Sequence, residues 1–285
     1  MLGGAFSSSP GGKGANQAVA ARRAGAEVVF VTAVGDDDLG RKALEGYRRE
    51  GIDVSFAKVV PGAASGVALI YVGESGENMI GVASGANLKL GPEDIEALPD
   101  SLLRPGDVLL VSLEVPLDTA IRALERGKAA GTLNVLNPAP APSGEPAQIA
   151  RLLASVDLIT PNRGEAAAIA REPSVDSTIL EPIVRRLIDL GPARVVVTLG
   201  AKGCLVATRD GLRETLDPPK VEAVDTVGAG DVFNGALAVA LAEGRPILEA
   251  ARWACAAAAL AVTRPGAQDA SPTRSEIDRL ASGCR

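Results

Sequence analysis

The feature that most constrains this chain is a regular alternation of short apolar runs with amphipathic helical segments. The apolar runs, rich in valine, isoleucine and leucine, span residues 28–35, 107–115, 132–138, 157–162 and 193–200. Helical patterns lie between them, at residues 39–51, 117–131, 146–156 and 179–191. A strand covered on both faces has a continuous apolar sequence, whereas a half-exposed strand alternates with a period of two. The pattern therefore predicts an α/β fold with a central, mostly parallel sheet and helices on both faces.

Composition narrows the possible functions. The chain has 285 residues, of which 47% are hydrophobic and 22% charged, as is ordinary for a soluble globular protein. A net charge of −6 argues against a general nucleic-acid binder. Histidine is absent, which excludes Ser-His-Asp hydrolysis and histidine-ligated zinc. No apolar run is long enough to span a membrane, and the scattered Cys204, Cys255 and Cys284 indicate a reducing, cytoplasmic setting.

Two segments interrupt the alternation. Residues 66–89 contain two strand-like runs around the turn "GESGEN", and residues 204–216 turn at Asp210-Gly211. Both are predicted to be β-hairpins. Because ligands of parallel α/β sheets bind beyond the carboxyl ends of the strands, a hairpin inserted in the first half is a candidate lid. Polar residues or glycine stand at those strand ends, namely Glu114, Asn137, Asn162 and Gly200.

Two polar motifs each allow two interpretations. In "PGGKGANQ" (10–17) the glycines let a ligand approach the backbone, and Asn16 could bind hydroxyl groups or cap a helix. The glycine spacing is neither a dinucleotide fingerprint nor a Walker P-loop. In "TPNRGE" (160–165), Asn162 and Glu165 have the spacing of a capping box, and their oxygens also suit a hydrated magnesium ion. Considered alone, this second motif favours a cap.

The segment "DTVGAGDVFNG" (225–235) joins a glycine-rich turn to the start of an apolar helix. Asp231 could cap that helix. However, the free N–H groups of Gly228, Ala229 and Gly230 would form an anion site beside the carboxylate. Phosphoryl transfer needs such donors together with a base for the attacking hydroxyl, and without histidine a carboxylate is the obvious base.

These motifs together resemble the PfkB carbohydrate kinase family, and within it the ribokinases. "GGKGANQA" and "DTVGAGDVFNGALAVALAEG" match the two family signatures. "LNPAPA" (136–141), "TPNRGE", "TLGAKG" (198–203) and "AAAALAVTRPGAQ" (256–268) match in the same order between and after them. The resemblance runs from residue 1 to about residue 280. It implies a ribokinase-like fold and transfer of the γ-phosphate of ATP to a sugar hydroxyl.

The resemblance also implies residue roles. Asp231 would be the catalytic base, with the backbone of Gly228, Ala229 and Gly230 as the anion hole. The sugar would contact Gly12, Lys13, Gly14, Ala15, Asn16, Glu114 and Asp231. The nucleotide would contact Asn162, Thr198, Leu199, Gly200, Ala201, Lys202, Gly203, Gly230 and Cys255, with Glu165 organising Mg²⁺. An activating monovalent cation, K⁺, would use Asp225, Val227, Ala261, Arg264, Gly266 and Ala270, mostly through carbonyl oxygens.

The implied reaction is phosphorylation of D-ribose at its 5-hydroxyl. A different PfkB substrate (a fructose phosphate, a nucleoside or deoxyribose) and an inactive sugar- or nucleotide-binding protein are the alternatives. The implied partners are D-ribose and ATP, with neither nucleic acid nor membrane, and a second copy of the chain bound through the lid.

Two departures from the family pattern accompany the resemblance. The last cation position falls on Ala270, beside Ser271. Family members also begin with a strand and a substrate-binding aspartate upstream of the glycine loop, and this chain starts too late to contain them. We therefore expect one domain over residues 1–285, with a lid from about 1–10 and 62–90, and with the N-terminal strand missing.

Overall fold

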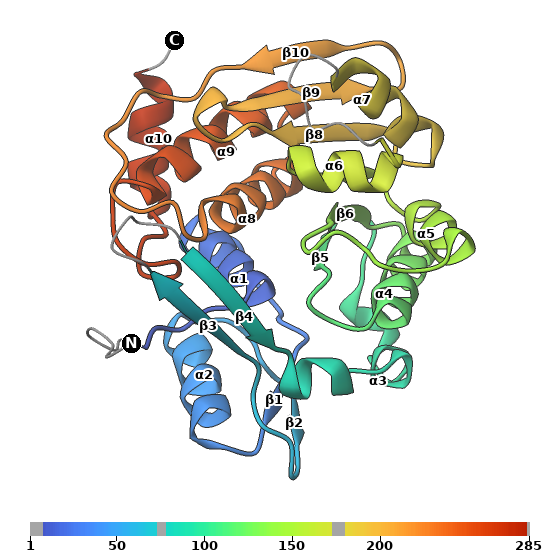
Figure 1. Cartoon of the computed structure of the whole chain (residues 1–285), viewed down its shortest axis with the longest axis vertical. Helices are drawn as coiled ribbons and strands as arrows, with labels where there is room; N and C mark the ends of the chain where they lie inside the picture. Colours follow the sequence, from blue (N-terminus) through green and yellow to red (C-terminus); the bar gives the residue numbers. More distant parts are fainter. Residues whose placement is uncertain (1–7, 73–77, 173–179, 284–285) are drawn as a thin grey trace.

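The computed structural model describes residues 8–72, 78–172 and 180–283, and its centre is a six-stranded sheet in the order β10-β9-β8-β7-β6-β5 (Figure 1). Strands β5 to β8 run parallel, and β9 pairs antiparallel with both β8 and β10. The strands are β5 (Val108–Ser112), β6 (Leu133–Asn137), β7 (Leu158–Ile159), β8 (Arg194–Thr198), β9 (Cys204–Thr208) and β10 (Arg213–Leu216). The predicted α/β class with a mostly parallel sheet is confirmed.

Helices cover both faces of this sheet (Figure 1). One face carries α4 (Leu117–Ala130), α5 (Pro146–Leu153), α6 (Arg163–Ala170) and α7 (Leu180–Asp189). The other carries α1 (Lys13–Arg23), α8 (Ala229–Ala242), α9 (Ile247–Ala261) and α10 (Arg274–Ser282). Successive strand residues point to opposite faces, so Leu158 packs with α8 and α9 while Ile159 packs with α4 to α7. Continuous apolar strands follow from this double coverage.

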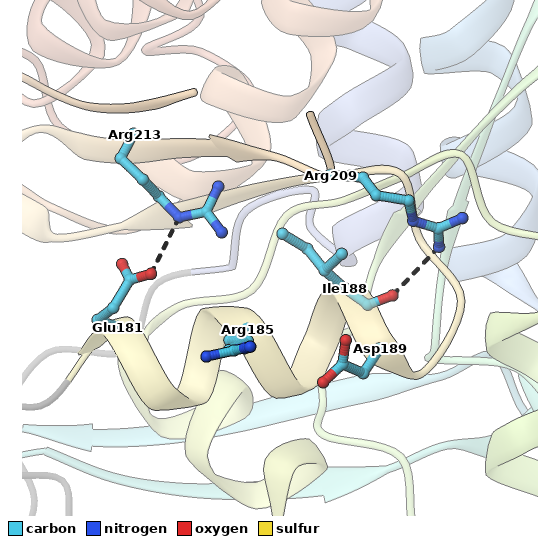
Figure 2. A pocket seen from close by; sticks show the side chains of 6 residues that line it. All are labelled: Glu181, Arg185, Ile188, Asp189, Arg209 and Arg213. Carbon is cyan, nitrogen blue, oxygen red and sulfur yellow. Dashed lines mark hydrogen bonds and ion pairs between the residues drawn. The ribbon is translucent and has the colours of Figure 1, made fainter. Parts of the chain in front are cut away.

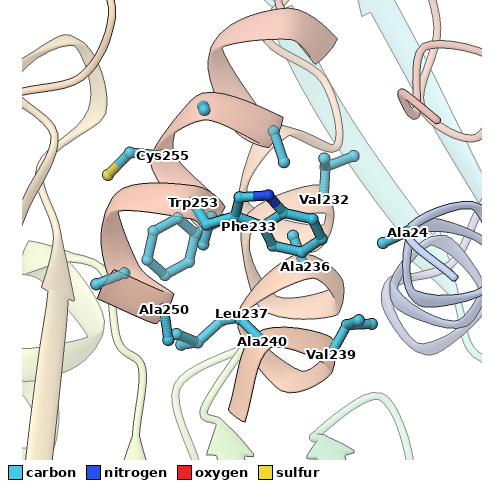
Figure 3. Packing of buried hydrophobic residues seen from close by; sticks show 14 of the residues in the cluster. Ala24, Val232, Phe233, Ala236, Leu237, Val239, Ala240, Ala250, Trp253 and Cys255 are labelled. Atoms are coloured by element: carbon cyan, nitrogen blue, oxygen red, sulfur yellow. The ribbon is translucent and has the colours of Figure 1, made fainter. Parts of the chain in front are cut away.

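Helices α8 and α9 pack against each other and supply many residues of the core on this face (Figure 3). Both helices are rich in alanine, which lets their backbones approach closely, and Phe233 and Trp253 fill the remaining space. The buried Trp253 ring donates its Nε1–H to Asp278 of α10 over 2.8 Å. Within the described residues no helix is both long and apolar enough to cross a membrane.

The N-terminal part of the chain forms two small sheets of its own. Strands β1 (Ala33–Gly35) and β2 (Lys58–Val60) pair in parallel, with α2 (Asp38–Arg49) between them in the chain. Strand β1 is shorter than the predicted strand 28–35, where residue 29 makes only an isolated bridge. The cause is the turn at residues 54–57, closed by a bond from Ala57 N–H to the Val54 carbonyl, which interrupts the partner strand.

Both predicted hairpins are present. Strands β3 (Val67–Val72) and β4 (Asn78–Ala83) pair antiparallel. After β4 come the 3₁₀ helix η1 (Gly85–Lys89), the short α-helix α3 (Pro92–Glu96) and the 3₁₀ helix η2 (Asp100–Leu102). The tip of this hairpin, and residues 1–7 of the predicted lid, lie outside the described residues. In the second hairpin, β9–β10, Gly211 adopts φ 105° at the turn, a conformation that favours glycine.

Candidate active site

Helix α8 begins one turn earlier than a capping role for Asp231 requires. The N-cap is Gly228, with φ 74°, and Asp231 lies inside the first turn without capping it. The interpretation of Asp231 as the helix cap is therefore wrong. Its side chain instead points toward α1, and it is only 7% exposed. A buried carboxylate needs hydrogen-bond donors, and α1 supplies them.

Two amides of α1 hold the Asp231 carboxylate. Asn16 donates from Nδ2 to Oδ2 over 2.8 Å, and Gln17 donates from Nε2 to Oδ1 over 3.1 Å. Residues more than two hundred positions apart thus meet because α1 and α8 pack side by side (Figure 1). Asn16 is not a helix cap, since α1 begins at Lys13. Sequence reasoning missed Gln17, although it directly follows Asn16 in the glycine motif.

The surroundings of Asp231 raise its pKa above the usual value. Burial is the main cause, and the negative charge of Glu114 adds to it. The hydrogen bond from Asn16, the charge of Lys13 and the hydrogen bond from Gln17 act in the opposite direction. A carboxylate with a raised pKa is a stronger base than a solvated one, which suits proton abstraction near neutral pH.

The predicted sugar residues meet beside this carboxylate. The backbone N–H of Lys13 donates to Glu114 Oε2 over 2.7 Å, which joins the glycine loop to the end of β5. Gly12 has φ 95°, and a Cβ there would come 3.7 Å from the same oxygen. At Gly14 a Cβ would come within 3.3 Å of Phe30, so this position permits close packing. Ala15 faces the apolar interior and offers only its backbone.

Asn16 retains one unpaired polar atom. Its Oδ1 is buried and has no hydrogen-bond partner among the described residues. Such an acceptor is costly to leave unsatisfied inside a protein. A bound ligand with hydroxyl donors would satisfy it. The orientation of the amide is set by Asp231, which accepts from Nδ2 and leaves Oδ1 for the ligand.

At the end of β7, Asn162 and Glu165 form the predicted capping box of α6. Glu165 N–H donates to Asn162 Oδ1 over 2.9 Å, and Asn162 N–H donates to Glu165 Oε2 over 2.8 Å. The pKa of Glu165 is raised, chiefly by burial, while Lys13 lowers it and Asp231 raises it. Glu165 therefore shares an electrostatic environment with the carboxylate at α8, and the cap leaves its second oxygen for a cation.

The predicted nucleotide turn follows β8. Thr198 ends the strand, the 3₁₀ turn η3 (Gly200–Lys202) exposes its side chains, and Gly203 reverses the chain with φ 75°. Leu199 N–H donates to the Gly203 carbonyl over 2.7 Å, which closes the turn. Cys255 of α9 lies behind it, with its Sγ 3.7 Å from Cys204 Sγ. An isolated bridge between Asn162 and Thr198 brings these two predicted residues together, whereas the Cys255 side chain is buried.

The predicted cation residues lie in two segments, the loop before α8 and the end of α9 with the loop that follows it. Asp225 accepts hydrogen bonds from Val227 N–H over 3.0 Å and from Gly266 N–H over 2.8 Å. The Ala261 carbonyl already accepts from Arg264 N–H, and the Arg264 side chain pairs with Glu276. Ala270 is buried. The structure therefore brings Asp225, Val227 and Gly266 together, and directs the Arg264 guanidinium away from them.

A hollow of about 540 Å³ lies elsewhere, between α7 and the β9–β10 hairpin (Figure 2). The two arginines that the hairpin contributes both have partners within the protein. Arg209 donates to the Ile188 carbonyl over 3.2 Å, and Arg213 pairs with Glu181 over 3.3 Å. None of the predicted site residues lines it. The lining residues are Glu181, Arg185, Ile188, Asp189, Arg209 and Arg213.

The site combines a buried carboxylate, a helix N-terminus and polar strand ends at one edge of a covered parallel sheet. These features define an α/β enzyme of the phosphotransferase class, in which backbone donors and a carboxylate act on a hydroxyl group. The chain belongs to the pfkB family of carbohydrate kinases, whose family model matches residues 1–274.

Known proteins agree with this assignment. The chain is 41% identical over 268 residues to a ribokinase of Haemophilus influenzae, covering 93% of this chain and 85% of that protein. A solved ribokinase structure from Giardia lamblia matches 100% of this chain and 92% of its own, with a TM-score of 0.90 at 33% identity. The Arabidopsis thaliana ribokinase complexed with ribose and ATP matches 95% and 87%, with a TM-score of 0.82 at 29% identity.

Proposed function

We propose that this protein transfers the γ-phosphate of ATP to the 5-hydroxyl of D-ribose and releases D-ribose 5-phosphate and ADP. The observation that carries the proposal is the Asp231 carboxylate, buried at the start of α8 and held by amides of the glycine motif. The identity to ribokinases over most of the chain supports the choice of sugar. The Arabidopsis relative, solved with ribose and ATP, supports the substrate pair.

In the proposed mechanism Asp231 accepts the proton of the attacking hydroxyl. The hydroxyl oxygen forms a bond to the γ-phosphorus while the bond to the β–γ bridging oxygen breaks, and that oxygen leaves with ADP. The N–H groups of Gly228 and Gly230 have no acceptor within the described part of the chain, and Ala229 N–H makes only a long contact of 3.3 Å to the Thr226 carbonyl. These donors, with the helix dipole, would stabilise the transferring group.

The sugar would lie between the glycine motif and the end of β5. The unpaired Asn16 Oδ1 would accept a hydrogen bond from a sugar hydroxyl, and Glu114 would accept another. Lys13 would add positive charge near the phosphoryl group, since its charge is already felt by both Asp231 and Glu165. ATP would bind along the turn Thr198–Gly203 and beside Asn162.

Cations would complete the site. The free oxygen of Glu165 suits Mg²⁺, which neutralises phosphate charge and is usually held partly through water. The loop of Asp225 and Gly266 supplies a carboxylate and carbonyl groups, which suit K⁺. We expect faster turnover in K⁺ than in Na⁺ at equal ionic strength. Equal rates in K⁺, Na⁺ and a bulky organic cation would contradict the K⁺ site.

The β3–β4 hairpin would act as a lid and as the contact in a homodimer. It exposes Leu69 at 54%, Met79 at 74% and Val82 at 65%, an unusual concentration of apolar area on a small element. A cytoplasmic location agrees with Cys204 and Cys255, which remain free thiols although their sulfur atoms are 3.7 Å apart.

The test is ATP-dependent phosphorylation of a panel: D-ribose, 2-deoxyribose, a fructose phosphate and a nucleoside. We expect the highest kcat/KM for ribose. A higher value for another acceptor would assign the chain to a different substrate within the family. Binding of ribose and ATP without any turnover would indicate an inactive binding protein instead.

A further inference from the structure

We propose that Gln17 is a positioning residue for the base Asp231, and that its amide is oriented by a relay which starts at the main-chain carbonyl of Thr160 and passes through Asn137. The proposal rests on the role of Asp231 as the base. It concerns three buried positions, on α1 and at the ends of β6 and β7, to which the resemblance assigns no role.

The relay consists of three hydrogen bonds in series. Asn137 Nδ2 donates to the Thr160 carbonyl over 3.0 Å. Gln17 Nε2 donates to Asn137 Oδ1 over 2.9 Å, and the same nitrogen donates to Asp231 Oδ1 over 3.1 Å. All of these side chains are buried, with Gln17 only 3% exposed and Asn137 6%. Both N–H groups of the Gln17 amide are therefore used.

The chemistry of the first acceptor determines the orientation of every later group. A main-chain carbonyl can only accept, so Asn137 must turn its Nδ2 toward Thr160 and its Oδ1 toward Gln17. Gln17 must then present Nε2 rather than Oε1, which leaves its second N–H for Asp231. The strand end thus selects a donor at the carboxylate, because the opposite amide orientation would place two acceptors against each other.

A second branch holds the backbone next to Asp231. The Thr160 hydroxyl donates to Asn234 Oδ1 over 2.5 Å, and Asn234 Nδ2 donates to the Gly230 carbonyl over 2.8 Å. Thr160 thus contacts the first turn of α8 through Asn234 and the carboxylate through Asn137 and Gln17. The side chain and its backbone are located by the same strand end, which leaves the carboxylate little freedom to rotate.

The charged groups that face Asp231 do not replace the Gln17 bond. They are Lys13 on α1, Glu114 beyond β5 and Glu165 on α6, one positive and two negative. Gln17 donates to the ionised carboxylate, which is the form that accepts a proton. Removing this donor therefore disfavours the active form. It also removes one of the two bonds that orient the carboxylate.

The test begins with Gln17→Met, which keeps the length of the side chain and removes both donors. We expect the acidic limb of the kcat/KM profile to move upward by about one pH unit, and kcat at neutral pH to fall about tenfold or more. The KM for ribose should change little, because the Gln17 side chain is buried and both of its N–H groups are used within the protein. Activity in Asp231→Asn, measured in parallel, checks the underlying assignment.

The relay itself is tested by a matched pair on one strand. Asn137→Leu breaks the relay without touching Asp231. Asn134→Leu removes another buried asparagine, near the opposite end of β6, whose Nδ2 donates to the Leu124 and Ser155 carbonyls at 2.7 Å each and takes no part in the relay. We expect both variants to lower the melting temperature, and only Asn137→Leu to move the acidic limb upward.

The outcomes separate the two proposals. High activity in Asp231→Asn overturns the base assignment and the relay with it. Loss of activity in Asp231→Asn with an unchanged acidic limb in Gln17→Met overturns the role of Gln17 alone. If Asn137→Leu and Asn134→Leu move the acidic limb of the kcat/KM profile equally, general loosening of the core explains the shift. That result also contradicts the relay. If Gln17→Met does not fold, the comparison of Asn137→Leu with Asn134→Leu tests the relay instead.

Discussion

The six-stranded sheet and the N-terminal region, residues 24–72 and 78–83, are built from similar apolar sequences but differ in coverage. In the sheet, Val196 and Leu136 are 0% exposed. In the N-terminal region, Val29 is 44% exposed and Val59 is 47% exposed. The sheet strands lie between two helical layers, whereas β1 and β2 form a two-stranded sheet with a small cluster around Tyr47 and Ile52. A strand contributes fully to the core only when both faces are covered.

Within the N-terminal region, one carboxylate makes several hydrogen bonds. Asp37 caps α2 by accepting from Gly40 N–H over 2.8 Å, and it also accepts from the N–H and hydroxyl of Ser65 over 2.8 Å and 2.7 Å. One carboxylate thus ties the start of α2 to the segment before β3. Such contacts fix geometry more than they add stability, because each replaces a hydrogen bond to water.

Helix α1 joins the two regions. Its residues Ala15 and Val19 pack into the N-terminal cluster, while Ala20 and Ala21 pack against α8. At its end, Arg23 pairs with Glu50 and also donates to carbonyls of the loop before α10. Because α1 carries Asn16 and Gln17, the geometry of the Asp231 carboxylate depends on both regions. The difference in coverage predicts that the sheet contributes more stability than the N-terminal region, and α1 places the candidate site between the two.

The largest expected effect is at Asp231, where α1 meets α8. Asp231→Asn should lower kcat by about 10²- to 10⁴-fold, because it removes the base. Its melting temperature at neutral pH should equal or exceed that of the wild type. Burial raises the pKa of Asp231, so ionisation disfavours the folded state once the pH exceeds the usual value of 3.8. Asn16 can turn its unpaired Oδ1 toward the new amide. Near wild-type turnover would contradict the base role.

A matched pair of valines measures the difference in coverage directly. Val196→Ala in β8 should lower the free energy of unfolding by about 2 kcal/mol, from lost burial and the cavity left behind. Val59→Ala in β2, at a half-exposed site, should cost about 0.5 kcal/mol or less. Urea denaturation of both variants gives the two values. Equal costs would show that the N-terminal region is as well packed as the sheet.

A pair of helical glycines sharpens the role of α1. At Gly235 a Cβ would come 2.6 Å from the Gln17 carbonyl and 2.8 Å from Ala20 Cβ, so Gly235→Ala should destabilise by about 1–3 kcal/mol and lower kcat. At Gly46 of α2 the nearest atom would be 4.0 Å away, so Gly46→Ala should stabilise by about 0.5–1 kcal/mol. Thermal unfolding and turnover are measured together. If Gly235→Ala is destabilised but its turnover is unchanged, the packing of α1 against α8 does not control catalysis.

The smallest expected effect is a pH dependence confined to the N-terminal region. Hydrogen bonds from the Ser65 backbone, the Ser65 hydroxyl and the Gly40 backbone lower the pKa of Asp37 to about 2. Its stabilising contribution is therefore complete above the usual value of 3.8 and disappears as the pH falls toward 2. Asp37→Asn should flatten the stability profile over this interval. The neighbouring Asp38→Asn, whose carboxylate pairs with Arg41, is the control. Identical profiles in wild type and Asp37→Asn would contradict the assignment.

Much of the architecture could be predicted because it depends on local patterns. The runs at 107–115, 132–138 and 193–200 each contain an observed strand, and 117–131 contains α4 almost residue for residue. The capping box of Asn162 and Glu165 was predicted from spacing alone. The run 28–35 was predicted less well, since only its last residues join a ladder and a turn in its partner interrupts the rest.

The sequence by itself determined the layers of the fold, the hairpins, the family and the candidate base, because periodicity and short motifs depend on neighbouring residues. Only the tertiary structure decided what Asp231 does with its oxygens. Whether it caps α8 or faces α1 depends on the packing of two helices whose contacting residues, Gln17 and Asp231, are 214 positions apart, and no local signal encodes that contact. The orientation of Gln17 depends in turn on a carbonyl at the end of β7. Hydrogen-bond direction in a buried site follows from the complete set of donors and acceptors, which exists only once the chain has folded.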